Sequence, residues 1–80
     1  MMLSVAQCRA ARALLGWAAA ELASTAAVGI MTVHRFESGE PVRQASLDKI
    51  IAAFSTAGVT FIEAGAASPD GGEGVRFVPS

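Results

Sequence analysis

The chain has 80 residues, of which 52% are hydrophobic and 16% are charged, with a formal net charge of -1 and one cysteine. A chain of this length forms one small domain and buries only about 60% of the surface that its unfolded form exposes. A single cysteine excludes a disulfide scaffold, and the sequence has no His/Cys cluster with the spacing of a zinc site. We therefore expect self-association to supply the stability that so small a core lacks.

No segment of the sequence is typical of a membrane span or a signal peptide. The longest uncharged apolar stretch, residues 13–20, is far shorter than the roughly 20 residues that a membrane span requires. Arg9 and Arg12 lie inside the first apolar block, where a signal peptide carries no charge. We therefore expect a cytoplasmic protein with no membrane partner. In a reducing compartment, Cys8 is interpreted as a small buried core residue.

The first part of the chain predicts two short helices. Ser4 followed by Gln7 is the pattern of a capping box, and apolar residues then recur at helical spacing. This pattern predicts a helix over residues 4–15, which a left-handed Gly16 would end. The alanine-rich segment 18–26 carries Leu22, Ala23 and Ala26 on one face, and it predicts a short second helix.

Two more helices are predicted further along the chain. Gly29 is an acceptable N-cap, and apolar residues then recur at helical spacing over residues 30–37 until Gly39. A fourth helix is predicted over residues 46–57, with Gly58 as its end.

The last part of the chain has the composition of two strands. Residues 59–63 and 74–78 are β-branched and aromatic runs, and residues 64–73 between them are rich in Gly, Ala, Ser, Pro and Asp. We expect an open β-hairpin whose long connection is poorly ordered.

Two short helices joined by three or four residues, the second beginning at a small N-cap, form the helix-turn-helix pattern. The matching residues are Arg9-Ala10-Ala11-Arg12-Ala13-Leu14-Leu15-Gly16-Trp17, Glu21-Leu22-Ala23, Val28 and Thr32-Val33-His34-Arg35-Phe36-Glu37-Ser38-Gly39. Over residues 5–58 the chain resembles the lambda-repressor-like (XRE) helix-turn-helix family. The resemblance implies a mostly α fold: a four-helix lambda-repressor-like DNA-binding domain over residues 1–58, followed by a C-terminal β-hairpin over residues 59–80. The form with such a hairpin is similar to a small bacterial subgroup of the family.

In that family the third helix lies in the major groove, which implies DNA contacts from its first turns and from its exit. The implied DNA-binding residues are Gly29, Ile30, Met31, Thr32, His34, Arg35, Ser38 and Arg43. Arg35 can pair with guanine through two hydrogen bonds, and Ile30 and Met31 can meet thymine methyl groups. Ser38 and Arg43 lie where the family contacts phosphate. The alternatives are a surface arginine for Arg35 and a partly buried or protein-facing patch for Ile30 and Met31.

The resemblance also implies two structural features. Arg12 and Glu37 occupy positions that often form an ion pair between the first and third helices of the family. Ala27 occupies the turn position where the family usually has glycine. If Ala27 adopts a positive φ, its Cβ is a source of strain.

The two predicted strands are expected to form a dimer interface. The residues assigned to it are Val59, Phe61, Ile62, Val75, Phe77 and Val78. Their alternation places apolar groups on both faces of the hairpin, and packing on the helices can cover only one face. We therefore expect a twofold dimer in which the hairpins form a shared sheet.

These observations predict a transcriptional regulator, expected to be a repressor, that binds an inverted-repeat operator in double-stranded DNA as a homodimer. The alternative is a protein-interaction module of the antirepressor or antitoxin type, in which Ile30 and Met31 of the third helix bind another protein. An enzyme is not expected, because the sequence offers no nucleophile–base pair, carboxylate dyad or phosphate-binding glycine loop. No cofactor and no metal ion are expected.

Overall fold

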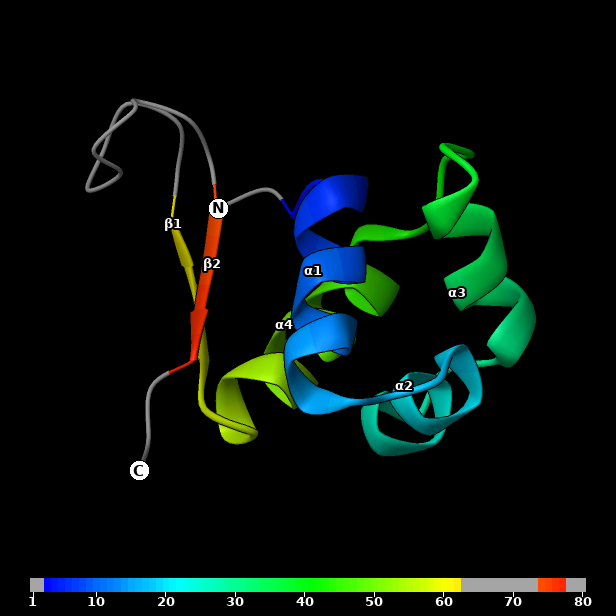
Figure 1. The fold of residues 1–80 in the computed structure, drawn as a ribbon. Coiled ribbons are helices and arrows are strands. Elements are labelled where there is room, and N and C mark those ends of the chain that lie inside the picture. Colours follow the sequence, from blue (N-terminus) through cyan, green and yellow to red (C-terminus); the bar gives the residue numbers. More distant parts are fainter. Residues whose placement is uncertain (1–2, 63–73, 78–80) are drawn as a thin grey trace.

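The computed structural model describes residues 3–62 and 74–77 (Figure 1). The elements of this part are α1 (Val5–Leu15), α2 (Ala19–Ala26), α3 (Ile30–Glu37), α4 (Gln44–Thr56), β1 (Val59–Ile62) and β2 (Gly74–Phe77). The described part is mostly helical, as predicted. The connection between the strands and Val78 lie outside the described residues, so the expected hairpin loop and its disorder stay predictions.

Both ends of α1 form the hydrogen bonds that the sequence predicts for them. The Ser4 hydroxyl accepts from the Gln7 N–H at 3.0 Å, and Gln7 Oε1 accepts from the Ser4 N–H at 3.0 Å, which completes the predicted capping box. At the other end, Gly16 has φ 68° and the N–H of Trp17 donates to the Arg12 carbonyl at 2.9 Å. The left-handed glycine therefore ends α1 as the sequence predicts.

The fourth helix begins two residues earlier than predicted. Arg43 is its N-cap, with φ -66° and ψ 142°, and the helix starts at Gln44. The Gln44 amide donates to Asp48 Oδ1 at 2.9 Å, one helical turn further on. This side-chain pair stabilises the two additional residues, since residues four apart face each other on a helix.

The core lies where the four helices meet. Its largest fully buried side chains come from each helix in turn: Cys8 of α1, Leu22 of α2, Val33 of α3, and Ile50 and Phe54 of α4. Each helix thus buries apolar side chains on one face only, which is the pattern of a bundle of amphipathic helices.

A two-stranded antiparallel sheet lies at one end of the helices. Figure 1 shows β1 and β2 beside α1 and α4, at the opposite end of the molecule from α3. Val59 pairs with Phe77 and Phe61 pairs with Val75. Val59 is buried in the helical core, so the sheet packs on the helices of the same chain through this face.

Aromatic rings connect the sheet to the helices. The ring of Phe54 lies 5.8 Å from that of Trp17 in a stacked arrangement and 5.8 Å from that of Phe61 edge-on. Each such ring pair contributes about 0.5–1.5 kcal/mol of stability beyond the contribution of the surface area that it buries. Through Phe54, α4 therefore packs against both Trp17, which follows α1, and Phe61 of β1.

Candidate functional site

A tight turn sets the position of α3. Residues 27–29 join α2 to α3, and within them Ala27 has φ 58° and ψ 43°, a left-handed conformation. The N–H of Val28 donates to the Ala23 carbonyl at 3.0 Å. Gly29, with φ -69° and ψ 147°, is the N-cap of α3, as predicted. The positive φ at Ala27 is the conformation that the resemblance implies for the family's glycine.

One face of α3 is buried and the other is free. Val33 and Phe36 are in the core, with 0% and 8% of their surface exposed. Ile30 and Met31 are 42% and 59% exposed, although both are large apolar residues. His34 and Arg35 are exposed on the following turn. The exposed face of α3 therefore presents apolar groups first and cations after them.

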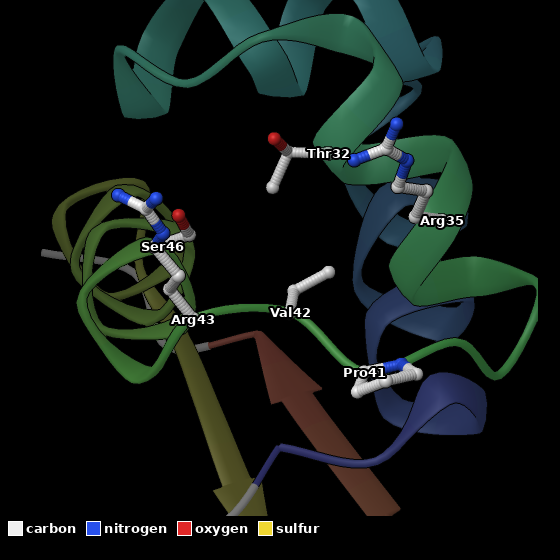
Figure 2. Close-up of a pocket in the computed structure, with 6 residues that line it drawn as sticks. All are labelled: Thr32, Arg35, Pro41, Val42, Arg43 and Ser46. Carbon is white, nitrogen blue, oxygen red and sulfur yellow. The ribbon is translucent and has the colours of Figure 1, made fainter.

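A groove of about 580 Å³ runs between α3 and the start of α4 (Figure 2). We call it the α3–α4 groove, and its lining residues are Thr32, Arg35, Pro41, Val42, Arg43 and Ser46. Figure 2 shows Thr32 and Arg35 on the α3 side, Arg43 and Ser46 on the α4 side, and Val42 and Pro41 on the segment that links the two helices. The groove thus combines two cations and two hydroxyls with an apolar segment.

The two arginines of the groove are not neutralised by the residues that the structure describes. There, the only salt bridge joins Arg12 to Glu37, and no hydrogen bond involves the guanidinium of Arg35 or Arg43. The N-cap Arg43 also makes no side-chain hydrogen bond to the first turn of α4. The groove therefore offers free donors and positive charge, which suit an anion.

Behind this surface, a polar network fixes the end of α3 to α1. Glu37 accepts two hydrogen bonds from Arg12 and one from the Cys8 thiol, whose Sγ lies 3.3 Å from Oε2. Burial alone would raise the pKa of Glu37, but the hydrogen bonds from Arg12 and Cys8 and the charges of Arg12 and Arg9 outweigh it, so this pKa is lowered. The ion pair that the resemblance implies is present.

The structure brings together some of the residues assigned to DNA binding and separates others. Thr32, Arg35 and Arg43 share the α3–α4 groove, whereas Ile30 and Met31 lie exposed on α3 outside its lining. The remaining assigned residues are the N-cap Gly29, the exposed His34 and the exposed C-cap Ser38.

Sequence reasoning missed three residues of the groove. Pro41 and Val42 belong to the segment that links α3 to α4, and they carry no side-chain signal for binding. Ser46 follows Arg43 by three residues at the start of a helix. Residues with this spacing lie on one helical face, so the assignment of Arg43 to DNA binding could have been extended to Ser46 from the sequence.

Comparisons with protein-family models, with curated proteins and with solved structures found no match. Among the described residues, no helix is long and apolar enough to span a membrane. The same residues contain no group of three or more His, Cys, Asp or Glu side chains that could hold a metal ion.

Proposed function

We propose that the protein is a sequence-specific DNA-binding transcriptional regulator of the helix-turn-helix class that acts as a homodimer, with a repressor as the expected form. The observation that carries the proposal is the exposed face of α3 beside the α3–α4 groove. An α-helix of this size fits the major groove of B-DNA, where apolar side chains can contact thymine methyl groups. The unpaired Arg35 and Arg43 lie next to that face and can contact phosphates.

The charge distribution supports this proposal in spite of the net charge of -1. Three of the seven acidic residues of the chain, Glu63, Asp70 and Glu73, belong to residues 63–73. Residues 1–49 carry five basic and four acidic residues, so this part of the chain has a formal net charge of +1. The acidic surplus therefore lies in the last part of the chain and not beside α3, and phosphate neutralisation depends on such local charge.

Selection from a random duplex library tests the proposal. The full chain is expected to enrich an inverted repeat whose half-site centres are about 34 Å, or one helical turn, apart. The variant Met31→Glu is expected to abolish binding, because it places a carboxylate against the base edges and phosphates. Leu14→Glu on α1 is the matched control, since Leu14 is 50% exposed and Met31 is 59% exposed. A library from which the wild-type chain enriches no sequence would overturn the proposal.

A second candidate function is a protein-interaction module that binds its partner through α3. The exposure of Ile30 and Met31 favours it, because adjacent exposed apolar side chains are typical of protein interfaces. Under this alternative, the wild-type chain enriches no duplex, whereas Met31→Glu loses a protein partner that Leu14→Glu retains. The library selection and the same pair of variants therefore separate the two functions.

A further inference from the structure

Each strand of the β1–β2 sheet is also one of its edges, because the described sheet has only two strands. One face of the sheet is occupied, since Val59 is buried and Phe61 packs on the helical core of the same chain. Outside the ladder with β2, no hydrogen bond among the described residues involves the backbone of Val59, Thr60 or Phe61. The outer edge of β1 therefore keeps main-chain donors and acceptors with which another strand can pair.

The two edges differ in the features that oppose pairing. All four residues of β1 (Val59–Ile62) are β-branched or aromatic, types that favour strands, and none of them is charged or a proline. The strand β2 (Gly74–Phe77) begins with glycine and contains Arg76. A charge on an edge strand discourages pairing, and two like charges brought opposite each other destabilise a strand pair. Figure 1 also shows β2 between β1 and α1, so the edge of β1 faces away from α1.

We propose that two copies of the chain pair through β1, antiparallel and across a twofold axis, to form one continuous sheet in the order β2-β1-β1-β2. This inference rests on the proposed homodimer and names the edge that forms it. A twofold contact uses the same surface of both copies, and a strand that pairs with itself in the antiparallel direction meets this condition. Thr60 is exposed on the face that the helices leave open, and Thr–Thr pairs across strands are favourable.

The twofold axis limits the register of the shared sheet. Residues directly opposite each other in a strand pair point to the same face, and successive residues of a strand alternate between faces. An axis perpendicular to the sheet keeps the helices of both copies on one face, so an even-numbered residue lies opposite an even-numbered one. In the registers that pair most of β1, Thr60 therefore lies opposite Thr60 or Ile62 of the second copy.

This arrangement also orients the two copies of α3 for the proposed contact with DNA. In each copy, α3 lies at the end of the molecule opposite to the sheet (Figure 1). Because the helices of both copies lie on one face of the shared sheet, both α3 helices lie on the side of the dimer away from the sheet. A single duplex can then contact both helices, as an inverted-repeat operator requires.

Cross-linking of single engineered cysteines in the full chain tests which edge pairs. Every variant also carries Cys8→Ala, so that the engineered thiol is its only one. In the order β2-β1-β1-β2, the two copies of residue 60 lie about 5 to 8 Å apart, directly opposite or diagonal to each other. The two copies of residue 76, the ladder partner of residue 60, are separated by three strand spacings, about 14 Å. A short bismaleimide should therefore join Thr60→Cys into a covalent dimer and leave Arg76→Cys monomeric on a denaturing gel.

Ser24→Cys is the control for random collisions, because Ser24 is exposed on α2, which lies away from the sheet, and it should give no covalent dimer. If Arg76→Cys cross-links and Thr60→Cys does not, the edge of β2 forms the shared sheet and the inference is wrong. If the chain sediments as a dimer but neither strand variant cross-links, the copies associate through their helices, so the inference is wrong while the proposed homodimer stands. A wild-type chain that sediments as a monomer would overturn both.

Discussion

The guanidinium of Arg12 donates two hydrogen bonds of 2.8 Å to Glu37, one to each carboxylate oxygen. Its third nitrogen donates to the carbonyl of Trp17 at 3.1 Å, and Arg9 donates to the main-chain carbonyl of Glu37 at 2.9 Å. The last residue of α3 is therefore fixed to α1 through both its side chain and its backbone. This attachment holds the direction of α3, and with it the exposed face that we propose to contact DNA.

The pairing of Glu37 predicts a loss of stability in acid. Its folded-state pKa lies below the usual value of about 4.3, so its contribution is fully present above that pH and is lost as pH falls through the folded-state pKa. Glu37→Gln should lower the free energy of unfolding at pH 7 by about 2 kcal/mol and flatten this acid dependence. Urea unfolding followed by Trp17 fluorescence measures both effects. Glu40→Gln, which changes an exposed carboxyl, is the control.

The thiol of Cys8 is predicted to be unreactive in the folded protein. Burial, the hydrogen bond to Glu37 and the charge of Glu37 raise the pKa of Cys8 to about 12, and the side chain is 0% exposed. Iodoacetamide at pH 8 should therefore label Cys8 only as fast as the chain unfolds. The variant Cys8→Ala/Ser55→Cys carries an exposed thiol instead and should react at once. Equal labelling rates for the two proteins in native buffer would contradict the buried position of Cys8.

The same pKa predicts weaker stability in alkali. The thiol of the unfolded chain ionises near pH 8.5, whereas the folded thiol stays protonated up to about pH 12. Ionisation therefore favours the unfolded state across this window, and stability falls as pH rises through it. In Cys8→Ala this part of the decline should be missing, which unfolding curves at pH 7.5 and pH 9.5 can measure.

The turn before α3 predicts a stabilising substitution. Ala27 is held at φ 58°, where a Cβ costs roughly 1 kcal/mol, so Ala27→Gly should raise the free energy of unfolding by up to about 1 kcal/mol. Ala20→Gly is the matched control, because Ala20 is also exposed but lies inside α2, where glycine should destabilise by about 1 kcal/mol. Thermal unfolding measures both changes. A lower midpoint for Ala27→Gly would show that Ala27 is not strained.

Signals that lie close together in the sequence predicted the helices well. The capping box of Ser4 and Gln7 and the left-handed Gly16 are local features, and α1 begins and ends where they indicate. The sequence predicts the start of α4 two residues too late, because the side-chain pair of Gln44 and Asp48 extends the helix toward its N-terminus. The strands were predicted from composition, and their register became known only from the structure.

Relationships across long separations were harder to predict. The hydrogen bond from Cys8 to Glu37 joins residues 29 apart, and the sequence indicated only that Cys8 is buried. The α3–α4 groove depends on the angle between two helices, which the packing of the shared core determines. Arg35 and Arg43 could therefore be assigned to DNA binding one by one from the sequence, but not to a common groove.

The β1–β2 sheet limits how two copies of the chain can assemble. Val59 and Phe61 contact the helical core of their own subunit, so this face is already occupied. The other face carries Thr60, which is exposed and is the backbone partner of Arg76 in the register of the strands. A shared sheet between subunits must therefore use the strand edges, where backbone N–H and C=O groups remain available for pairing.

Substitution of Thr60 by proline is expected to convert the homodimer that we propose into a monomer. Proline in a strand removes a backbone donor and blocks strand pairing, whereas Val59 and the core beneath it remain. Deleting residues 59–80 should also give a monomer, but it removes Val59 from the core and so changes folding as well. Thr60→Val is the matched control, because valine favours strands and should keep the dimer. Sedimentation equilibrium measures the assembly state, and Trp17 fluorescence confirms that each variant is folded. If Thr60→Pro remains a folded dimer, the subunits associate through the helices and the shared-sheet arrangement is wrong.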